Sequence, residues 1–293
     1  VELEKQKGKT VMKRLKQLQA GFILGTIIIY SALLTSCNIV SKDDTLFDSI
    51  NGQSLFNEEI NPEGSSSENG FDATLEEVLH LISDYGYEPT YPNIFGRNTG
   101  TEIANAMDSA RGGQHLSIPT TYPTGAWYHY NDSTCNYSCQ ITEYIYWGLT
   151  TYLGAQDYPG RAEEINNEWE ITTSENLQTT DTTLYGIITN TEYNLPKILP
   201  TGDYPTTNVT VNFTIESSLP NELSELSDKF SKYISIFGIH ILGTTQVEES
   251  KFLHAASVLA EYLDDDQDGT VNDSDMVNHL VSNKAAMIIT YDE

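Results

Sequence analysis

An acidic segment near the C-terminal end, from Asp264 to Asp275, carries six carboxylates in twelve residues. Like charges this close together repel one another strongly unless a cation lies between them. Alternate side chains at Asp264, Asp266 and Asp268 can converge on one point, where their oxygens would bind a hard divalent cation. The alternative is an acidic connector between two helices that holds no metal, and we expect the cation site.

This segment resembles the calcium loop of EF-hands and of the related bacterial dockerin-type repeats, in which D-x-D-x-D-G precedes an acid at position twelve. Gly269 permits the sharp turn with positive φ that brings the next carbonyl inward. Val271 stands where EF-hands carry an apolar residue directed at the core. The resemblance implies a Ca²⁺ site with this ligand set: Asp264, Asp266, Asp268, Thr270, Asn272 and Asp275.

Two departures from the EF-hand pattern bear on what the loop does. Asp275 is one methylene shorter than the usual glutamate, which weakens its reach to the ion and favours competition by Mg²⁺. The sequence holds one such loop, and a single loop has no partner hand to open against. We therefore expect a structural site and not a sensor, for which a Kd on the order of 10⁻⁴ to 10⁻³ M suffices outside the cell.

The N-terminal segment has the order of a secretory signal. The basic residues Lys13, Arg14 and Lys16 precede an apolar run at 21–34, and Leu34-Thr35-Ser36-Cys37 follows. The run is shorter than the roughly 18 to 20 residues that span a bilayer. The last four residues resemble the lipobox of bacterial lipoproteins, which implies cleavage before Cys37 and lipid on its thiol. The alternative is an uncleaved transmembrane anchor.

The residues after Cys37 bear on location. Residue 38 is Asn, and in Gram-negative lipoproteins an Asp at this position favours retention at the inner membrane, so the resemblance implies the outer membrane. Lys42-Asp43-Asp44 resembles a tag that sends some lipoproteins to the cell surface. A solvated, charged tether is the alternative for this short segment.

Cys135 and Cys139 remain as a pair outside the cytosol. Their spacing is neither the redox C-x-x-C nor a zinc pattern with a second pair. We expect a local disulfide that stabilises the fold by about 2 kcal/mol, and the alternative is two free thiols.

The chain has a net charge of −27. Removal of residues 1–36 would take away six basic and two acidic side chains, leaving nine Lys and Arg against 40 Asp and Glu. So acidic a surface repels nucleic-acid phosphates and anionic lipid headgroups. We expect no nucleic-acid partner, membrane attachment through the lipid alone, and a surface protein or a glycan as the remaining kind of partner.

Signals for catalysis are sparse. A zinc-peptidase helix reads H-E-x-x-H, and the nearest segment, Thr142 to Tyr146, has Glu143 without either histidine. Glu168 lies downstream, where some such enzymes carry a third ligand. We do not expect an enzyme. The competing hypothesis is a metal-dependent, zincin-like hydrolase that uses Glu143, Glu168 and one or more histidines, and a pocket beside Glu143 would favour it.

Two further groups could bind ligands. His254 and Glu261 lie two turns apart on one helix face and could join a metal site, although we expect an ordinary solvated surface. The aromatic segment 127–130 could stack on a sugar ring, although packing under the cysteine loop is favoured.

The elements that must position these residues indicate a helix-rich α+β domain. We expect a signal peptide at 1–36, a lipidated cysteine with a flexible acidic tether at 37–70, and a globular domain at 71–293 that includes an EF-hand-like unit at 248–284. Thr74 and Glu77 suggest a capping box. Helices are expected at 102–110, 140–153, 161–169 and 221–231, strands at 209–215, 233–242 and 286–291, and irregular chain at 171–206.

Overall fold

The structure, a computed structural model, describes residues 50–205 and 211–291. The expected signal peptide, the lipidation site Cys37 and the charged segment 42–44 lie outside the described residues. Four strands form one sheet in the order β1-β4-β3-β2, with β4 parallel to both β1 and β3, and β2 antiparallel to β3. The strands are β1 (Asn51–Phe56), β2 (Lys232–Ile236), β3 (Ile239–Gly243) and β4 (Ala285–Thr290).

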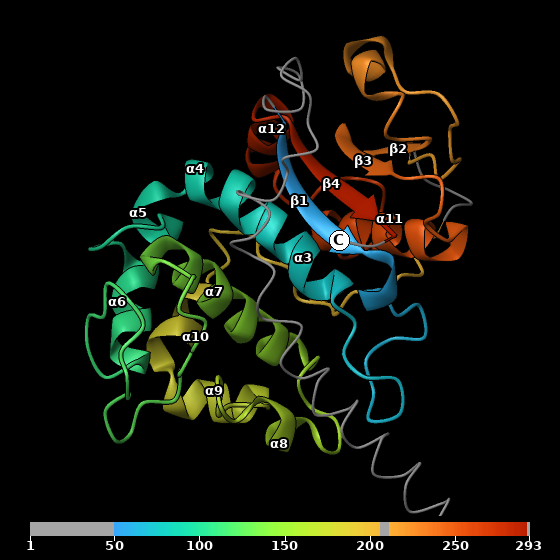
Figure 1. Ribbon diagram of the computed structural model, residues 1–293. Helices are drawn as coiled ribbons and strands as arrows, with labels where there is room; N and C mark the ends of the chain where they lie inside the picture. The colour runs from blue at the N-terminus through green and yellow to red at the C-terminus, as the bar shows by residue number, and fades with distance from the viewer. Residues whose placement is uncertain (1–49, 206–210, 292–293) are drawn as a thin grey trace, which may run out of the picture.

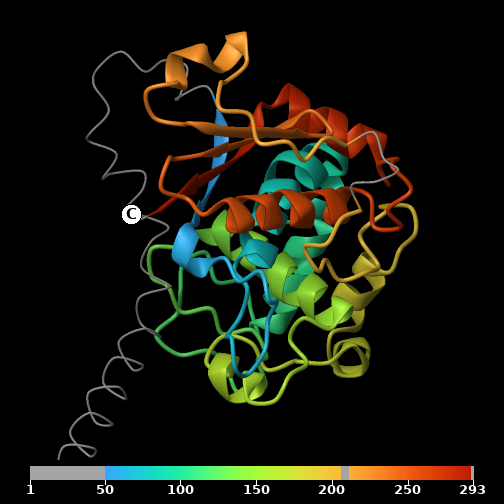
Figure 2. The same ribbon diagram turned by 90° about the vertical axis from the view of Figure 1, so that its right-hand side faces the viewer.

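Helices are the other regular elements of the described chain, and Figures 1 and 2 show α6 to α10 gathered at the end of the molecule away from the sheet. Between the two ends lies α3, which contacts β1, α7 and α11. The α-helices are α3 (Thr74–Ile82), α4 (Glu88–Thr90), α5 (Pro92–Phe95), α6 (Glu102–Ala110), α7 (Tyr137–Leu153), α8 (Arg161–Ile165), α9 (Ser174–Thr180), α10 (Thr182–Ile188), α11 (Glu249–Leu263) and α12 (Ser274–Ser282). Shorter turns are the 3₁₀ helices η2 (Asn57–Glu59) and η4 (Asn221–Leu226) and the π-helical turn η3 (Ser83–Tyr87), which continues α3.

Helix α7 is buried on almost every side and forms the axis of the helical end. It can pack closely against α10 because Gly148 has no side chain, and a Cβ there would meet Leu184 Cδ2 at 2.4 Å. Asp181, just before α10, accepts hydrogen bonds from Tyr144 Oη and from Trp127 Nε1. This buried carboxylate therefore ties the start of α10 to α7.

The α+β class expected from the sequence is confirmed. The helix expected at 102–110 is α6, and the strand expected at 286–291 is β4, which lies in the middle of the sheet. The unit expected at 248–284 consists of α11, an acidic loop and α12.

The folded domain begins well before residue 70, where the sequence predicts the end of the flexible tether. Residues 51–56 form β1, which pairs with β4 along its whole length. Asp72 accepts a hydrogen bond from the backbone N–H of Asn61, so residues between β1 and α3 also belong to the fold. The sequence did not predict this strand, because residues 51–54 are polar or glycine and only its last two residues are apolar and buried.

Several expected elements differ from the structure. The single strand expected at 233–242 is a hairpin, since Phe237 and Gly238 both have positive φ and turn the chain between β2 and β3. Residues 171–206 are not all irregular, because α9 and α10 lie within them. The helix expected at 161–169 ends at Ile165, and the one at 221–231 is a 3₁₀ turn ending at Leu226.

The strand expected at 209–215 falls partly outside the described residues, and residues 211–215 form no strand. The capping box expected at Thr74 and Glu77 is also wrong. Instead, Asp72 Oδ1 accepts the backbone N–H of Thr74, while Glu77 accepts a hydrogen bond from Gln53 Nε2 on β1. Glu77 thus joins α3 to the sheet.

Cys135 and Cys139 form a disulfide, with their Cα atoms 5.4 Å apart. Between them, Asn136 is the N-cap of α7, and its Oδ1 accepts the backbone N–H of Cys139 at 3.1 Å. The crosslink therefore fixes the first turn of the helix that carries Glu143.

Candidate metal centres

The acidic loop begins where α11 ends, and its first carboxylate is fixed by the loop backbone. The Asp264 side chain is buried and accepts the backbone N–H groups of Gly269 at 2.8 Å and Asp268 at 3.2 Å. Gln267 and Gly269 have φ angles of 57° and 90°, which fold the chain back over this carboxylate. The negative end of the α11 dipole lies at the same point, where it favours a cation.

Three carboxylates converge in this loop. Oxygen atoms of Asp264, Asp266 and Asp268 all lie within 4.8 Å of one another, and the last two residues are exposed. A hydrogen bond from the Asp268 N–H lowers the pKa of Asp266, but burial and repulsion from Asp268 and Asp264 outweigh it and raise that pKa. A divalent cation at this point would relieve the repulsion.

The other three expected ligands lie in the second half of the loop and at the start of α12. The Asn272 side chain donates from Nδ2 to Asp265 Oδ1 at 2.8 Å, and Thr270 directs its N–H to Asp268 Oδ1 at 2.7 Å. Asp275 is exposed in the first turn of α12, whose start is capped by Asp273. The structure therefore brings together the D-x-D-x-D carboxylates, and Asp275 does not belong to that group.

A tyrosine that sequence reasoning missed also contacts the loop. Tyr204 is buried and donates its hydroxyl hydrogen to Asp264 Oδ2. Burial and this hydrogen bond raise the pKa of Tyr204 above its ordinary value. Nearby, Tyr91 donates to Asp273 Oδ2 at 2.5 Å. No local pattern marks either tyrosine, because each lies far from the loop in the sequence.

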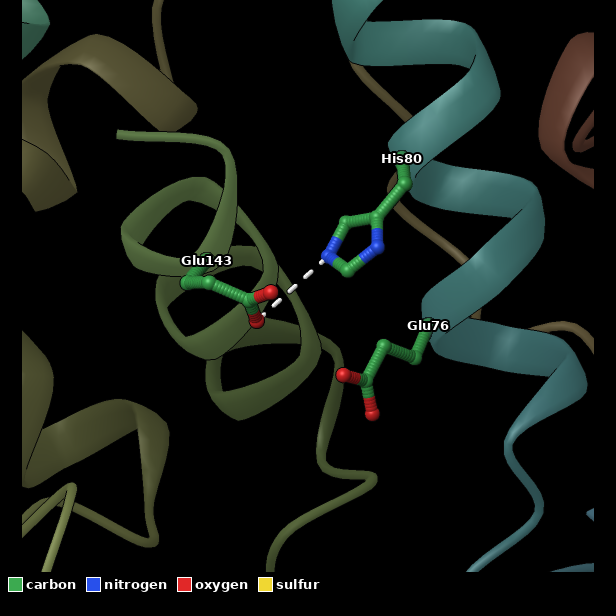
Figure 3. Close-up of side chains that lie close together, drawn as sticks. All are labelled: Glu76, His80 and Glu143. Carbon is green, nitrogen blue, oxygen red and sulfur yellow. Dashed lines mark ion pairs between the residues drawn. The ribbon is translucent and has the colours of Figure 1, made fainter. Parts of the chain in front are cut away.

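A second group lies between α3 and α7. Glu76 and His80 are one turn apart on α3 and face Glu143 on α7 (Figure 3). One ligand atom from each of the three residues lies within 4.8 Å of the other two, and His80 Nε2 is 3.6 Å from Glu143 Oε2. His80 and Glu143 are only 1 % and 3 % exposed.

The charges in this group are strongly perturbed. Burial lowers the pKa of His80, but attraction and hydrogen bonding to Glu143 and Glu77 outweigh it and raise that pKa well above its ordinary value. Burial, reinforced by repulsion from Glu143, likewise raises the pKa of Glu76. Glu168 is also buried, and burial with repulsion from Glu143 raises its pKa to about 7.

The structure thus places Glu143 where its charge repels that of Glu168, and it brings to Glu143 a histidine from a different helix. The positions where H-E-x-x-H would carry histidines have other contacts: Thr142 Oγ1 donates to Asp84 at 2.7 Å, and Tyr146 Oη accepts from Gln156 Nε2 at 3.4 Å. Sequence reasoning missed Glu76 and His80, whose signal was an E-x-x-x-H spacing on one helix face.

His254 and Glu261 do not form a solvated surface, contrary to expectation. Both are buried, and His254 Nε2 lies 2.7 Å from Asp72 Oδ2. Glu261 accepts the backbone N–H groups of Thr201 and Gly202 at 2.8 and 2.7 Å. These partners occupy the two side chains and fix residues 201–202 and the chain before α3 against α11.

In the aromatic segment 127–130, Tyr128 and Tyr130 are buried, whereas Trp127 and His129 are partly exposed. Tyr128 is buried against Tyr144, with ring centroids 5.3 Å apart, and its hydroxyl donates to the Gln140 carbonyl beside the disulfide. Tyr130 is buried as well. These two rings are therefore covered by protein and offer no face to a sugar.

Within the residues that the structure describes, no helix combines the length and the apolar character needed to cross a bilayer. No family model, curated protein or solved structure matches this chain. The functional argument therefore depends on the two groups of ligand atoms.

Proposed function

We propose that this chain is a calcium-stabilised lipoprotein, held on the bacterial outer membrane by lipid on Cys37, with a binding or structural role. The observation that carries the calcium part is the convergence of Asp264, Asp266 and Asp268 between two helices. The lipid anchor and the location rest on the sequence around Cys37.

Calcium at this loop would act on the whole sheet. Helix α12 follows the loop, and β4, the middle strand, begins shortly after α12 ends. A cation that holds the loop in place therefore also restrains α12, the helix that precedes β4. Calcium at about 100 times its Kd would stabilise the folded state by roughly 2.7 kcal/mol if it binds only that state.

The calcium part is tested with the full chain purified in detergent and stripped with EDTA. We expect the melting temperature to rise with added Ca²⁺, and the double variant Asp266→Asn with Asp268→Asn to lose that rise. Both residues are exposed, so these substitutions leave the core intact. The control is Asp157→Asn with Glu175→Gln, which removes the same charge from exposed positions elsewhere. An equal rise in both double variants would contradict the proposal.

The anchor is tested separately, by intact-mass analysis of the chain extracted from membranes of the producing cell. We expect a mass that corresponds to cleavage before Cys37 plus attached acyl chains, and a Cys37→Ser variant that is neither acylated nor retained in the membrane fraction. An unprocessed, unacylated N-terminus would refute this part and leave the calcium site unaffected.

A metal-dependent hydrolase is the second candidate, favoured by the approach of His80 to Glu143 at 3.6 Å. We rank it second because the Glu143 side chain is 3 % exposed, so protein covers the atoms that a substrate would have to reach. Two surface hollows, one lined by Ala162 and Glu170 and the other by Phe213 and Leu253, include no residue of this group. Hydrolysis of a peptide or ester panel that Glu143→Gln abolishes, with folding intact, would reverse the ranking.

A further inference from the structure

The group between α3 and α7 has more negative charge than its protein surroundings balance. Three carboxylates lie around one imidazole: Glu77 and Glu143 contact His80, and Glu76 converges on the same point. The charge of Glu143 also repels that of Glu168. Even a fully charged His80 would offset only one of them. Buried charge of one sign is held by protons or by a cation, because desolvation otherwise makes it very costly.

The nearest basic side chains are engaged elsewhere. Arg161 donates to Gln156 Oε1 at 2.8 Å and lies near Glu164, and Arg111 pairs with Asp108. Within the described ranges, no Lys or Arg forms an ion pair with Glu76, Glu143 or Glu168. Burial and repulsion from Glu143 raise the pKa of Glu168 and outweigh the attraction from Arg161, which lowers it. The protein therefore supplies little positive charge of its own at this point.

A second observation comes from Glu168, outside the two helices. Its side chain is 7 % exposed, and its Oε1 atom is buried without a hydrogen-bond partner in the described structure. Repulsion from Glu143 is the largest charge effect on this carboxylate, which is not among the three residues whose ligand atoms converge. A buried carboxylate oxygen without a donor is expensive for a protein unless a ligand satisfies it.

We propose that Glu76, His80 and Glu143 bind one zinc ion. Two atoms bonded to one tetrahedral Zn²⁺ at about 2.0–2.1 Å lie roughly 3.3 Å apart. The 3.6 Å between His80 Nε2 and Glu143 Oε2 is close to that separation and longer than an ordinary hydrogen bond. The imidazole disfavours Ca²⁺ and Mg²⁺, and the absence of thiolate ligands disfavours Cu⁺.

This zinc site would be structural. All of its ligands except Glu76 are buried, and its two helices belong to different parts of the molecule: α3 packs on the sheet side, and α7 is the axis of the helical end. Zinc would crosslink the two parts and replace several protons that the carboxylates otherwise have to hold. The site is independent of the calcium loop, so either can fail without the other.

The first test measures metal in the full-length protein, purified in detergent without chelators. We expect about one zinc per chain by elemental analysis, retained in the calcium-loop variant Asp266→Asn with Asp268→Asn. Apoprotein prepared with a chelator should bind Zn²⁺ again in competition with a chromophoric chelator, and Co²⁺ in its place should give visible absorption from a low-symmetry site. Protein that contains no zinc and takes up none would overturn the proposal and leave protons as the occupants of the group.

The second test uses near-isosteric variants. His80→Gln and Glu143→Gln should each raise the Kd for Zn²⁺ by at least about tenfold, the lower end of what the loss of one partner around a metal costs. His279→Gln and Glu175→Gln are the matched controls, since neither belongs to the group, and they should leave the Kd unchanged. Near-UV circular dichroism identifies any variant that fails to fold, and the zinc content of the wild-type chain decides the question in that case. Zinc binding that both ligand variants retain would place the metal elsewhere.

Discussion

The hydrogen bond from Tyr204 to Asp264 gives a sharp test of how the acidic loop is held. In the absence of calcium, this hydroxyl is one of the groups that offset the charge on a fully buried carboxylate. A hydrogen bond to a charged group contributes about 1.5–3 kcal/mol. Tyr204→Phe should therefore destabilise the calcium-free chain by roughly 2 kcal/mol, which in a domain of this size lowers the melting temperature by about 4–8 °C.

Calcium should reduce that loss, because the cation supplies positive charge to the same carboxylate. We expect the gap in melting temperature between wild type and Tyr204→Phe to narrow when EDTA is replaced by excess Ca²⁺. Differential scanning calorimetry of both proteins in both conditions measures the four values needed. An equal gap in the two conditions would refute the idea that Asp264 is a calcium ligand.

The matched control is Tyr91→Phe. Tyr91 makes the same kind of bond, at 2.5 Å, to Asp273 in the same loop, but Asp273 caps α12 and lies outside the converging carboxylates. Loss of the Tyr91 hydroxyl should lower the melting temperature by a similar amount with and without calcium. If calcium reduces the loss of melting temperature in Tyr204→Phe but not in Tyr91→Phe, the difference is due to calcium binding at Asp264. It is then not a general effect of removing a tyrosine hydroxyl beside the loop.

Two further predictions concern the fold. Gly148→Ala should destabilise by about 1–3 kcal/mol in urea unfolding, since the new Cβ would overlap Leu184, whereas Gly186→Ala, with nothing near its Cβ, should stabilise by up to about 1 kcal/mol; similar effects at both sites would contradict this packing. Burial lowers the pKa of His240, which lies 3.0 Å from the Tyr233 hydroxyl, below its ordinary 6.5. Because the folded state binds this proton less readily than the unfolded state, the free energy of unfolding is highest above pH 6.5, where His240 is neutral in both states. It decreases as the pH falls through the pKa of the folded state. His240→Gln should therefore lose less stability than wild type between about pH 7.5 and 5 in chemical unfolding, and parallel losses would show that His240 does not titrate in this way.

The sequence predicted those elements whose structure depends on residues within the element itself or next to it. Both ends of helix α6 were predicted, because Gly112 and Gly113, which have positive φ, follow it and end the helix. Strand β4 was found from its unbroken apolar run, and α11 from an apolar stripe that the structure buries. The converging aspartates of the loop were recognised from spacing alone, which is the geometry that the structure has.

Contacts between distant segments decided what the sequence did not reveal. Strand β1 lies in a polar stretch and becomes a strand only because β4 pairs with it. His80 and Glu143 belong to helices that are far apart in the sequence, so no motif joins them. The same holds for Tyr204 and Asp264, and for His254, whose partner Asp72 precedes α3. Each of these pairs depends on the packing of α3, α7 and α11.

The position of β4 has a consequence for the order of assembly. Its parallel neighbours β1 and β3 do not pair with each other, and the Asn51 side chain bonds to the Asn283 carbonyl across a sequence separation of 232 residues. Neither strand can join a common sheet until β4 has been synthesised and inserted between them. Pairings of such long range make folding slow, so the complete sheet forms only after the acidic loop and α12, which precede β4, have been synthesised.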